Sequence, residues 1–177
     1  MNLVGSHIML RALEPEDLDY LYRTENDPDF AFFGDSHPPY SRYLLKLYIA
    51  QAHQSIQQTK QLRLVIHHKK ANAPIGLIDL FDFDPRNKRV ALGILISEKI
   101  YRGQGFGHEA VGLMLDYAFD QLDCHQVYTL VAQDNNASIA LFSSLSFQKG
   151  GVLMSWWNRD KDGFQDMLIY QKFKSDQ

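Results

Sequence analysis

This sequence contains a single cysteine and has no long apolar run. Cys124 stands alone among 177 residues, which excludes an internal disulfide and is typical of a reducing compartment. The longest apolar run, residues 90–96, is far shorter than the roughly 20 residues of a membrane-spanning helix. Charged residues such as Arg11, Glu14 and Glu16 interrupt the N-terminus, which therefore lacks the apolar core of a signal peptide. We expect a cytoplasmic protein with no membrane partner.

An excess of positive charge is also missing. Lys and Arg number 18 against 21 Asp and Glu, so the net charge of −3 provides no cationic field, and we expect no nucleic-acid partner. Ligand clusters for a metal are absent as well. His67 and His68 are adjacent on an expected strand, so their side chains point to opposite faces, and we expect no metal.

The remaining composition is that of a globular protein, with 45% hydrophobic and 12% aromatic residues. Neither an internal repeat nor a Ser/Gly-rich linker divides the chain, so residues 1–177 are expected to form a single domain.

Local patterns predict the element order β-α-α-β-β-β-α-β-α-β-β. Pro15 suits the first turn of a helix, and Ser41 suits the cap of the next helix. The β-α-β-α run within a mainly antiparallel arrangement predicts a mixed α/β or α+β fold. The strands are expected at 7–12, 62–66, 74–83, 88–96, 126–132, 151–158 and 166–173, and the helices at 15–26, 41–58, 105–121 and 136–145.

The most informative segment is the glycine-rich loop between the strand at 88–96 and the next helix. Gly103, Gly105 and Gly107 allow the backbone to approach a ligand closely, and Arg102 adds a cation. Free N–H groups at the helix start favour an anion, so the loop suits a pyrophosphate. A phosphate loop ending in Gly-Lys-Ser/Thr is not present, and the glycine spacing differs from that of the dinucleotide fingerprint. The alternative is that the glycines form a tight turn that binds no ligand.

The remaining form is Arg-x-x-Gly-x-Gly after a central strand, found here at residues 102–107. With it the sequence resembles the GCN5-related N-acetyltransferases (GNAT), in which such a loop binds the pyrophosphate of acetyl-CoA. Residues 135–147 resemble the family's Asn-x-x-(Ser/Ala)-Ile-x-Leu-Tyr-x-x-Leu-Gly-Phe segment, and residues 10–13 resemble the subgroup that acetylates ribosomal-protein N-termini and diamines. The resemblance covers nearly the whole chain and implies a GNAT-like acyl-CoA N-acyltransferase fold with splayed central strands.

The resemblance also implies a binding site for acetyl-CoA as co-substrate. Pantetheine would lie between the strands at 90–96 and 126–132 and bond to their backbones. A bulge at Gly93 would expose an N–H near Gly93 and Ile94 to the thioester carbonyl, as an oxyanion donor. Asn135 also suits a plain helix cap. The residues implied to bind the cofactor are Ile94, Leu95, Ile96, Ser97, Arg102, Gly103, Gln104, Gly105, Phe106, Gly107, His108, Asn135 and Ser138.

Two departures from the family pattern leave the catalytic residues unknown. The tyrosine that usually protonates the leaving thiolate is replaced by Phe142, whose position is implied to face the thioester. The glutamate that many members carry in the central strand is also missing, because the slot holds Ala91, Leu92 and Gly93. The resemblance implies an N-acetyltransferase in which an amine attacks acetyl-CoA directly in a ternary complex. The alternative is a CoA-binding sensor or scaffold with little catalysis.

The acceptor remains open between a small amine or polyamine and a peptide N-terminus. Asp79 and Asp82 resemble the carboxylates that hold the amine in diamine acetyltransferases, although a solvated strand end explains them equally well. Strand alternation predicts that Asp82 and Asp84 share one face and that Asp79 lies on the other. A homodimer is left open.

Overall fold

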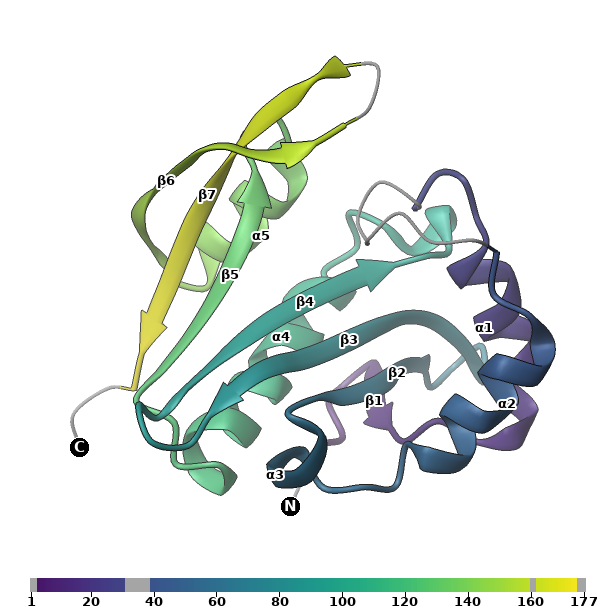
Figure 1. Ribbon diagram of the computed structural model, residues 1–177. Coiled ribbons are helices and arrows are strands. Elements are labelled where there is room, and N and C mark those ends of the chain that lie inside the picture. The colour runs from purple at the N-terminus through teal and green to yellow at the C-terminus, as the bar shows by residue number, and fades with distance from the viewer. Residues whose placement is uncertain (1–2, 31–38, 160–161, 175–177) are drawn as a thin grey trace.

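The computed structural model describes residues 3–30, 39–159 and 162–174. Its centre is a seven-stranded sheet in the order β1-β2-β3-β4-β5-β7-β6, in which β4 and β5 are parallel and every other neighbouring pair is antiparallel. The predicted mixed α/β fold is therefore confirmed (Figure 1). The strands are β1 (Ile8–Arg11), β2 (Leu62–His68), β3 (Ala73–Asp84), β4 (Arg89–Ile96), β5 (Gln126–Ala132), β6 (Gln148–Asn158) and β7 (Phe164–Phe173).

Helices cover both faces of the sheet. The helices are α1 (Leu18–Glu25), α2 (Arg42–Gln51), α3 (Ile56–Thr59), α4 (Phe106–Asp116) and α5 (Asn136–Ser144). Figure 1 shows α4 crossing behind the sheet. The larger core packs the buried face of α4, including Val111 and Met114, against Ile78 and Leu92 of the sheet. A second core joins α1 and α2 to Val65 and Leu77, which alternate with residues of the first core and so face the other way. We call the side of the sheet that faces away from α4, on which α1 and α2 lie, the open face.

One expected helix is divided in two. The predicted helix at 41–58 begins at its Ser41 cap, whose hydroxyl accepts a hydrogen bond from the N–H of Leu44, but α2 ends at Gln51. A second start signal follows, because Ser55 and Gln58 form a reciprocal capping box that begins α3. The prediction of one continuous helix was wrong because the apolar spacing continues across the break while the caps interrupt the backbone. No helix among the described residues is long and apolar enough to span a membrane.

Candidate active site

The central feature of the site is an opening between β4 and β5. The two strands pair only through Arg89–Gln126, Val90–Val127 and Ala91–Tyr128, and then they separate. Figure 1 shows them diverging from this junction. The separation leaves the rest of β4 paired with β3 on one side and facing the opening on the other. The splayed strands implied by the family resemblance are therefore present.

Hydrogen bonding determines which backbone groups of β4 face the opening. The N–H of Ser97 donates to Ile75 of β3, and an ideal Cβ on Gly76 would lie 2.3 Å from the Leu95 carbonyl oxygen. Odd-numbered residues of β4 therefore point their backbone groups at β3, because hydrogen-bonded pairs alternate along an antiparallel ladder. Backbone groups of Ile94 and Ile96 point into the opening.

The pairing and hydrogen bonds of β4 correct four expectations. Gly93 and Leu95 direct their backbone groups at β3, so Ile94 remains the oxyanion donor that the geometry supports. The expected bulge at Gly93 is not there: pairing runs unbroken from Gly76–Ile96 to Phe81–Ala91. The ladder opens because β5 departs, which requires no bulge in β4. Ser97 is also engaged, since its N–H donates to Ile75 of β3 and its hydroxyl lies 2.7 Å from that of Tyr20 on α1.

The glycine loop ends in an exposed helix N-terminus. Gly103 and Gly105 have φ angles of 71° and 86°, and Gly105 is the N-cap of α4. Apart from the chain neighbours, no atom of the described residues lies within 4 Å of the Cβ that either glycine would carry, so this part of the structure leaves the space above the loop open. The first helical hydrogen bond runs from Glu109 N–H to Gly105. The N–H groups of residues 106–108 therefore precede the helical ladder and are available to an anion.

The side chains of the loop differ in what they offer. Arg102 is exposed but folds back, donating from Nε to the Ile96 carbonyl at 2.8 Å and from Nη2 to Ser97 at 3.3 Å. Gln104 donates to the Ile100 carbonyl. Phe106 is buried against Tyr101 and offers only its backbone, whereas His108 is exposed.

The helix α5 provides a cap and a core residue. Asn135 accepts a hydrogen bond from Ser138 N–H at 3.1 Å, so the plain cap interpretation is confirmed. The side chain of Phe142 is only 2% exposed and packs edge-to-face on Phe147 at 5.1 Å. Position 142 therefore belongs to the core and presents no proton donor.

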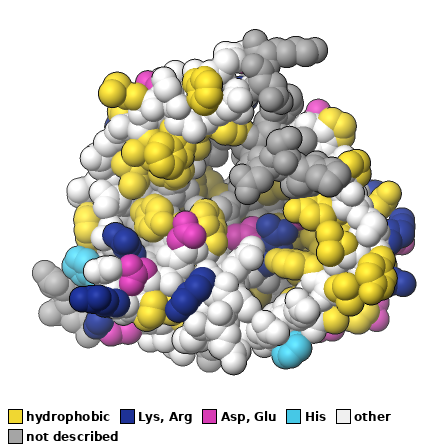
Figure 2. Space-filling view, viewed as in Figure 1, with side chains coloured by type: hydrophobic (Ala, Val, Ile, Leu, Met, Phe, Trp, Pro, Cys, Tyr) yellow, Lys and Arg dark blue, Asp and Glu magenta, His cyan; other side chains and the backbone are white. Residues whose placement is uncertain are grey.

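Small side chains form the floor of the open face beside the junction. Ala91 and Gly93 alternate with the buried residues of β4 and so lie on the open face. Among the described residues, a methyl group on Gly93 would meet only the Phe81 ring, at 3.4 Å, so packing against them does not require glycine there. Figure 2 shows charged side chains near the middle of this face, between groups of hydrophobic side chains. The open face of β4 therefore carries no large side chain at the two positions nearest Ile94 on this floor.

An ion-pair cluster borders this floor. Arg63 of β2 donates from Nε to Asp79 at 2.6 Å and from Nη1 to Glu25 of α1 at 2.5 Å, and Tyr48 of α2 lies 5.7 Å from the guanidinium. The ion pairs raise the pKa of the largely buried Arg63 against the opposing effect of desolvation. Asp79 was expected to bind substrate, but its carboxylate is already shared with Arg63. The cluster keeps one net negative charge.

A bulge in β3 changes where its acidic residues point. Pairing shifts by one residue between Phe81–Ala91 and Asp84–Arg89, and Asp82 has a positive φ of 51°. Because Asp82 is the extra residue, Asp84 lies on the open face with Asp79, and the alternation predicted for them was wrong. The Tyr128 side chain lies beside Asp82, and burial, followed by the Asp82 carboxylate, raises the pKa of its hydroxyl.

The only cysteine does not act as a nucleophile. Cys124 is fully buried, and burial together with Asp123 raises the pKa of its thiol to about 11. The thiolate is therefore scarce at neutral pH. Within the described ranges, no three His, Cys, Asp or Glu side chains are grouped as metal ligands would be.

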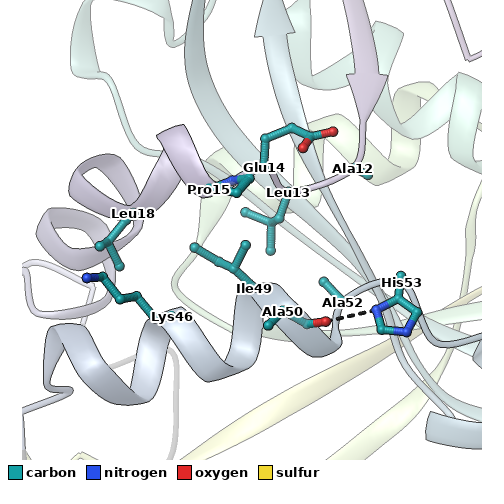
Figure 3. Close-up of a pocket in the computed structure, with 10 residues that line it drawn as sticks. All are labelled: Ala12, Leu13, Glu14, Pro15, Leu18, Lys46, Ile49, Ala50, Ala52 and His53. Atoms are coloured by element: carbon teal, nitrogen blue, oxygen red, sulfur yellow. Dashed lines mark hydrogen bonds between the residues drawn. The ribbon is translucent and has the colours of Figure 1, made fainter.

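A second hollow lies away from the opening, between the start of α1 and the end of α2 (Figure 3). Its volume is about 490 Å³, and its wall is mostly apolar, with Leu13, Leu18 and Ile49 inside and Glu14 and Lys46 at its polar positions. Neither the glycine loop nor the β4–β5 junction contributes to it. We do not include it in the candidate active site.

Sequence reasoning missed two features of the site. The contact of Arg63 with Asp79 depends on the β2–β3 register, which places the two residues opposite each other. The bulge at Asp82 carried a weak signal, since Asp tolerates positive φ better than most residues.

Comparison with known proteins agrees with this geometry. Residues 7–148 match the model of the acetyltransferase (GNAT) domain. The chain is 28% identical to the uncharacterized N-acetyltransferase p20 of Bacillus licheniformis over 97% of this chain and 96% of that protein.

Two solved structures have the same fold. One is a spermidine N-acetyltransferase from Vibrio cholerae in complex with CoA and spermine, with a TM-score of 0.81, 25% identity and 96% coverage of both chains. The other is a ribosomal-protein-S5-alanine acetyltransferase from Vibrio fischeri, with a TM-score of 0.85, 16% identity and coverage of 99% of this chain and 98% of that chain, a likeness of fold alone. The chain therefore belongs to the GNAT acetyltransferase family and is an N-acetyltransferase.

Proposed function

We propose that this enzyme transfers the acetyl group of acetyl-CoA directly to a small primary amine. The observation that carries the proposal is the opening between β4 and β5 beside the free N-terminus of α4. The N–H groups of residues 106–108 suit the pyrophosphate, and the backbone of Ile94 and the N–H of Ile96 suit the amide groups of pantetheine, since the Ile96 carbonyl already accepts from Arg102. This assignment keeps Gly103, Gly105 and Gly107 as the close-approach residues of the loop.

Direct transfer requires few protein groups. The acceptor nitrogen forms a bond to the thioester carbonyl carbon, the Ile94 N–H donates to the developing oxyanion, and the C–S bond then breaks to release CoA as a thiolate. The proton lost by the nitrogen and the proton gained by the sulfur balance. Positioning supplies much of the rate. Buried Cys124 gives no support to an acetylated enzyme intermediate.

Charge on the open face favours a cationic acceptor. The cluster of Arg63, Asp79 and Glu25 carries one net negative charge, and exposed Asp82 adds another. The Vibrio cholerae spermidine acetyltransferase, which binds spermine, has the same fold at 25% identity. A small amine or polyamine is therefore the first acceptor to test, and a peptide N-terminus is the second.

The test uses Gly105→Ala in the glycine loop. A methyl group at Gly105 occupies the open space where the pyrophosphate would lie, and its φ of 86° adds strain. Gly163→Ala is the matched control, because Gly163 has a φ of 73°, has equally open surroundings and lies in the distant β6–β7 turn. Titration calorimetry is expected to show that Gly105→Ala lowers the affinity for CoA about tenfold or more, which is about 1.4 kcal/mol of binding free energy. Gly163→Ala should bind CoA as the wild type does.

Turnover is measured as release of the CoA thiol with spermidine, putrescine and a peptide with N-terminal alanine. Turnover of at least one amine is expected. Tight CoA binding without turnover on any amine would favour a sensor, and equal CoA affinity in both glycine variants would overturn the assignment of the loop.

A further inference from the structure

The reaction needs a proton acceptor, and neither the central-strand slot at residues 91–93 nor position 142 supplies one. An amine that arrives as an ammonium ion must lose a proton before its nitrogen can attack. On β4, Ala91 and Gly93 contribute no carboxylate, and Phe142 is buried without a hydroxyl. A carboxylate on another element beside the junction would fill this role.

The bulge in β3 brings a carboxylate to that place. Phe81, Ala91 and Tyr128 form one row across the open face, because Ala91 pairs with both of the others. Asp82 is inserted next to this row, and its carboxylate reaches Tyr128 on β5 across the small side chain of Ala91. Tyr128 is the last residue of β5 that pairs with β4 before the strands separate. The carboxylate and the hydroxyl therefore meet at the apex of the opening.

We propose that Asp82 accepts the proton lost by the acceptor ammonium and that the Tyr128 hydroxyl positions its carboxylate. The inference rests on the proposed function and assigns the base for that reaction. The N–H bond of the ammonium breaks, Asp82 becomes a carboxylic acid, and the neutral amine attacks the thioester. The thiolate that leaves takes the second proton from the nitrogen, and exposed Asp82 returns its proton to water.

The surroundings of the pair suit this role. Arg89 of β4 and Asp84 of β3 are the other charged groups around Tyr128, and Asp84 is itself paired with Arg89 at 3.4 Å. On β7, Tyr128 pairs with the neutral residue Gln171. The cluster of Arg63, Glu25 and Asp79 lies beside Phe81 on the other side of the floor. Burial, followed by the Asp82 carboxylate, raises the pKa of Tyr128, so its hydroxyl stays protonated beside that carboxylate.

The decisive variant is Asp82→Asn, which keeps the shape of the side chain and tolerates the positive φ. With spermidine, or with the best amine of the panel, we expect kcat at pH 7 to fall roughly 10²–10⁴-fold while CoA affinity is unchanged. The activity of the variant should then rise tenfold per pH unit up to the pKa of the amine, because only free amine reacts. With methoxyamine, which is already neutral at pH 7, the loss should be less than about threefold.

Two further variants control the experiment. Asp84→Asn removes a neighbouring carboxylate that accepts from Asn87 and pairs with Arg89, and it should leave the pH profile unchanged. Tyr128→Phe should lower kcat less than Asp82→Asn while leaving the KM of the amine and CoA affinity unchanged, because the carboxylate is no longer held in place. A merely structural tyrosine would change stability and leave kcat at the wild-type value.

The possible results separate this inference from the proposed function. A loss in Asp82→Asn that appears only in KM, or that persists equally at alkaline pH and with methoxyamine, would show that Asp82 binds the acceptor without taking its proton. Unchanged kinetics would also overturn the inference while leaving amine acetylation intact. Absence of turnover by the wild type with every amine would overturn both.

Discussion

At the scale of single residues, Phe142 occupies the position at which the family resemblance implies a tyrosine. The Phe142 ring fills space between α5 and the sheet and contacts the Phe147 ring. A phenol at this position would need a hydrogen-bond partner within an apolar core. Packing thus explains the residue. Position 142 supplies no acid–base group, and the candidate acid–base groups lie on the open face.

We expect Phe142→Tyr to destabilise the protein without increasing its activity. A buried hydroxyl without a partner costs about 1–3 kcal/mol. Urea unfolding measures the cost, and CoA release with the best amine measures turnover. Phe142→Met, which keeps the site apolar, separates the effect of the hydroxyl from that of altered packing. An unchanged unfolding free energy together with a higher kcat would show that position 142 does reach the thioester.

At the scale of elements, two glycines on neighbouring strands have different reasons to be glycine. Gly76 of β3 lies so close to β4 that a Cβ would be 2.3 Å from the Leu95 carbonyl oxygen and 3.2 Å from the Ile96 Cα. Gly93 of β4 has no such backbone contact. Close packing of β3 against β4 requires glycine at position 76. At position 93 we expect glycine to leave space for the acceptor.

The pair Gly76→Ala and Gly93→Ala tests this difference. Gly76→Ala should force β3 and β4 apart and cost about 1–3 kcal/mol in unfolding free energy, because backbone atoms cannot rotate away. Gly93→Ala should leave the unfolding free energy nearly unchanged and raise the KM of the amine. Equal destabilisation by both changes would show that Gly93 also serves packing.

Sequence patterns gave the elements better than the site because elements depend on neighbours in the chain. The caps at Ser41 and Asn135 and the glycines of the loop act over three or four residues, so their spacing predicts them. The ion pair of Arg63 with Asp79 depends on a register between two strands, and the place of Asp82 depends on one extra residue in β3. A one-residue shift reverses the face of every later side chain, so a period-two pattern alone cannot locate these groups.

At the scale of the whole molecule, acidic residues stabilise the folded state in their ionised form. Burial alone would raise the pKa of Asp17, but hydrogen bonds from Arg11 at 2.6 and 2.8 Å and from the Glu14 N–H at 2.9 Å lower it. The pKa values of Asp29, Asp84, Glu109 and Asp123 are lowered as well. A lowered pKa in the folded state means that acid favours unfolding.

We expect the free energy of unfolding to be constant near neutral pH and to fall below about pH 4, where unfolded carboxyl groups begin to bind protons. The stabilisation from Asp17 is complete above its unfolded pKa and is lost as pH falls through its lower folded pKa. Asp17→Asn should therefore cost about 1–3 kcal/mol at pH 7 and progressively less in acid. Urea unfolding at several pH values measures the difference.

Asp19→Asn is the control for this experiment. Asp19 is 79% exposed and pairs with Arg42 on the surface, so its replacement should change the pH dependence little. A difference between Asp17→Asn and the wild type that stays constant down to pH 2 would contradict the linkage.

The separation of β4 from β5 has a consequence for the protein without its cofactor. The strands β4 and β5 pair through three residue pairs only. Beyond these pairs, each strand has a free edge that faces the other. Free edges attract other extended chains and are common starting points for aggregation. A cofactor that bonds to these edges would protect them as well as supply the acetyl group. Addition of CoA should therefore slow aggregation of the heated protein more than the same concentration of an amine does. Light scattering measures the rate of aggregation.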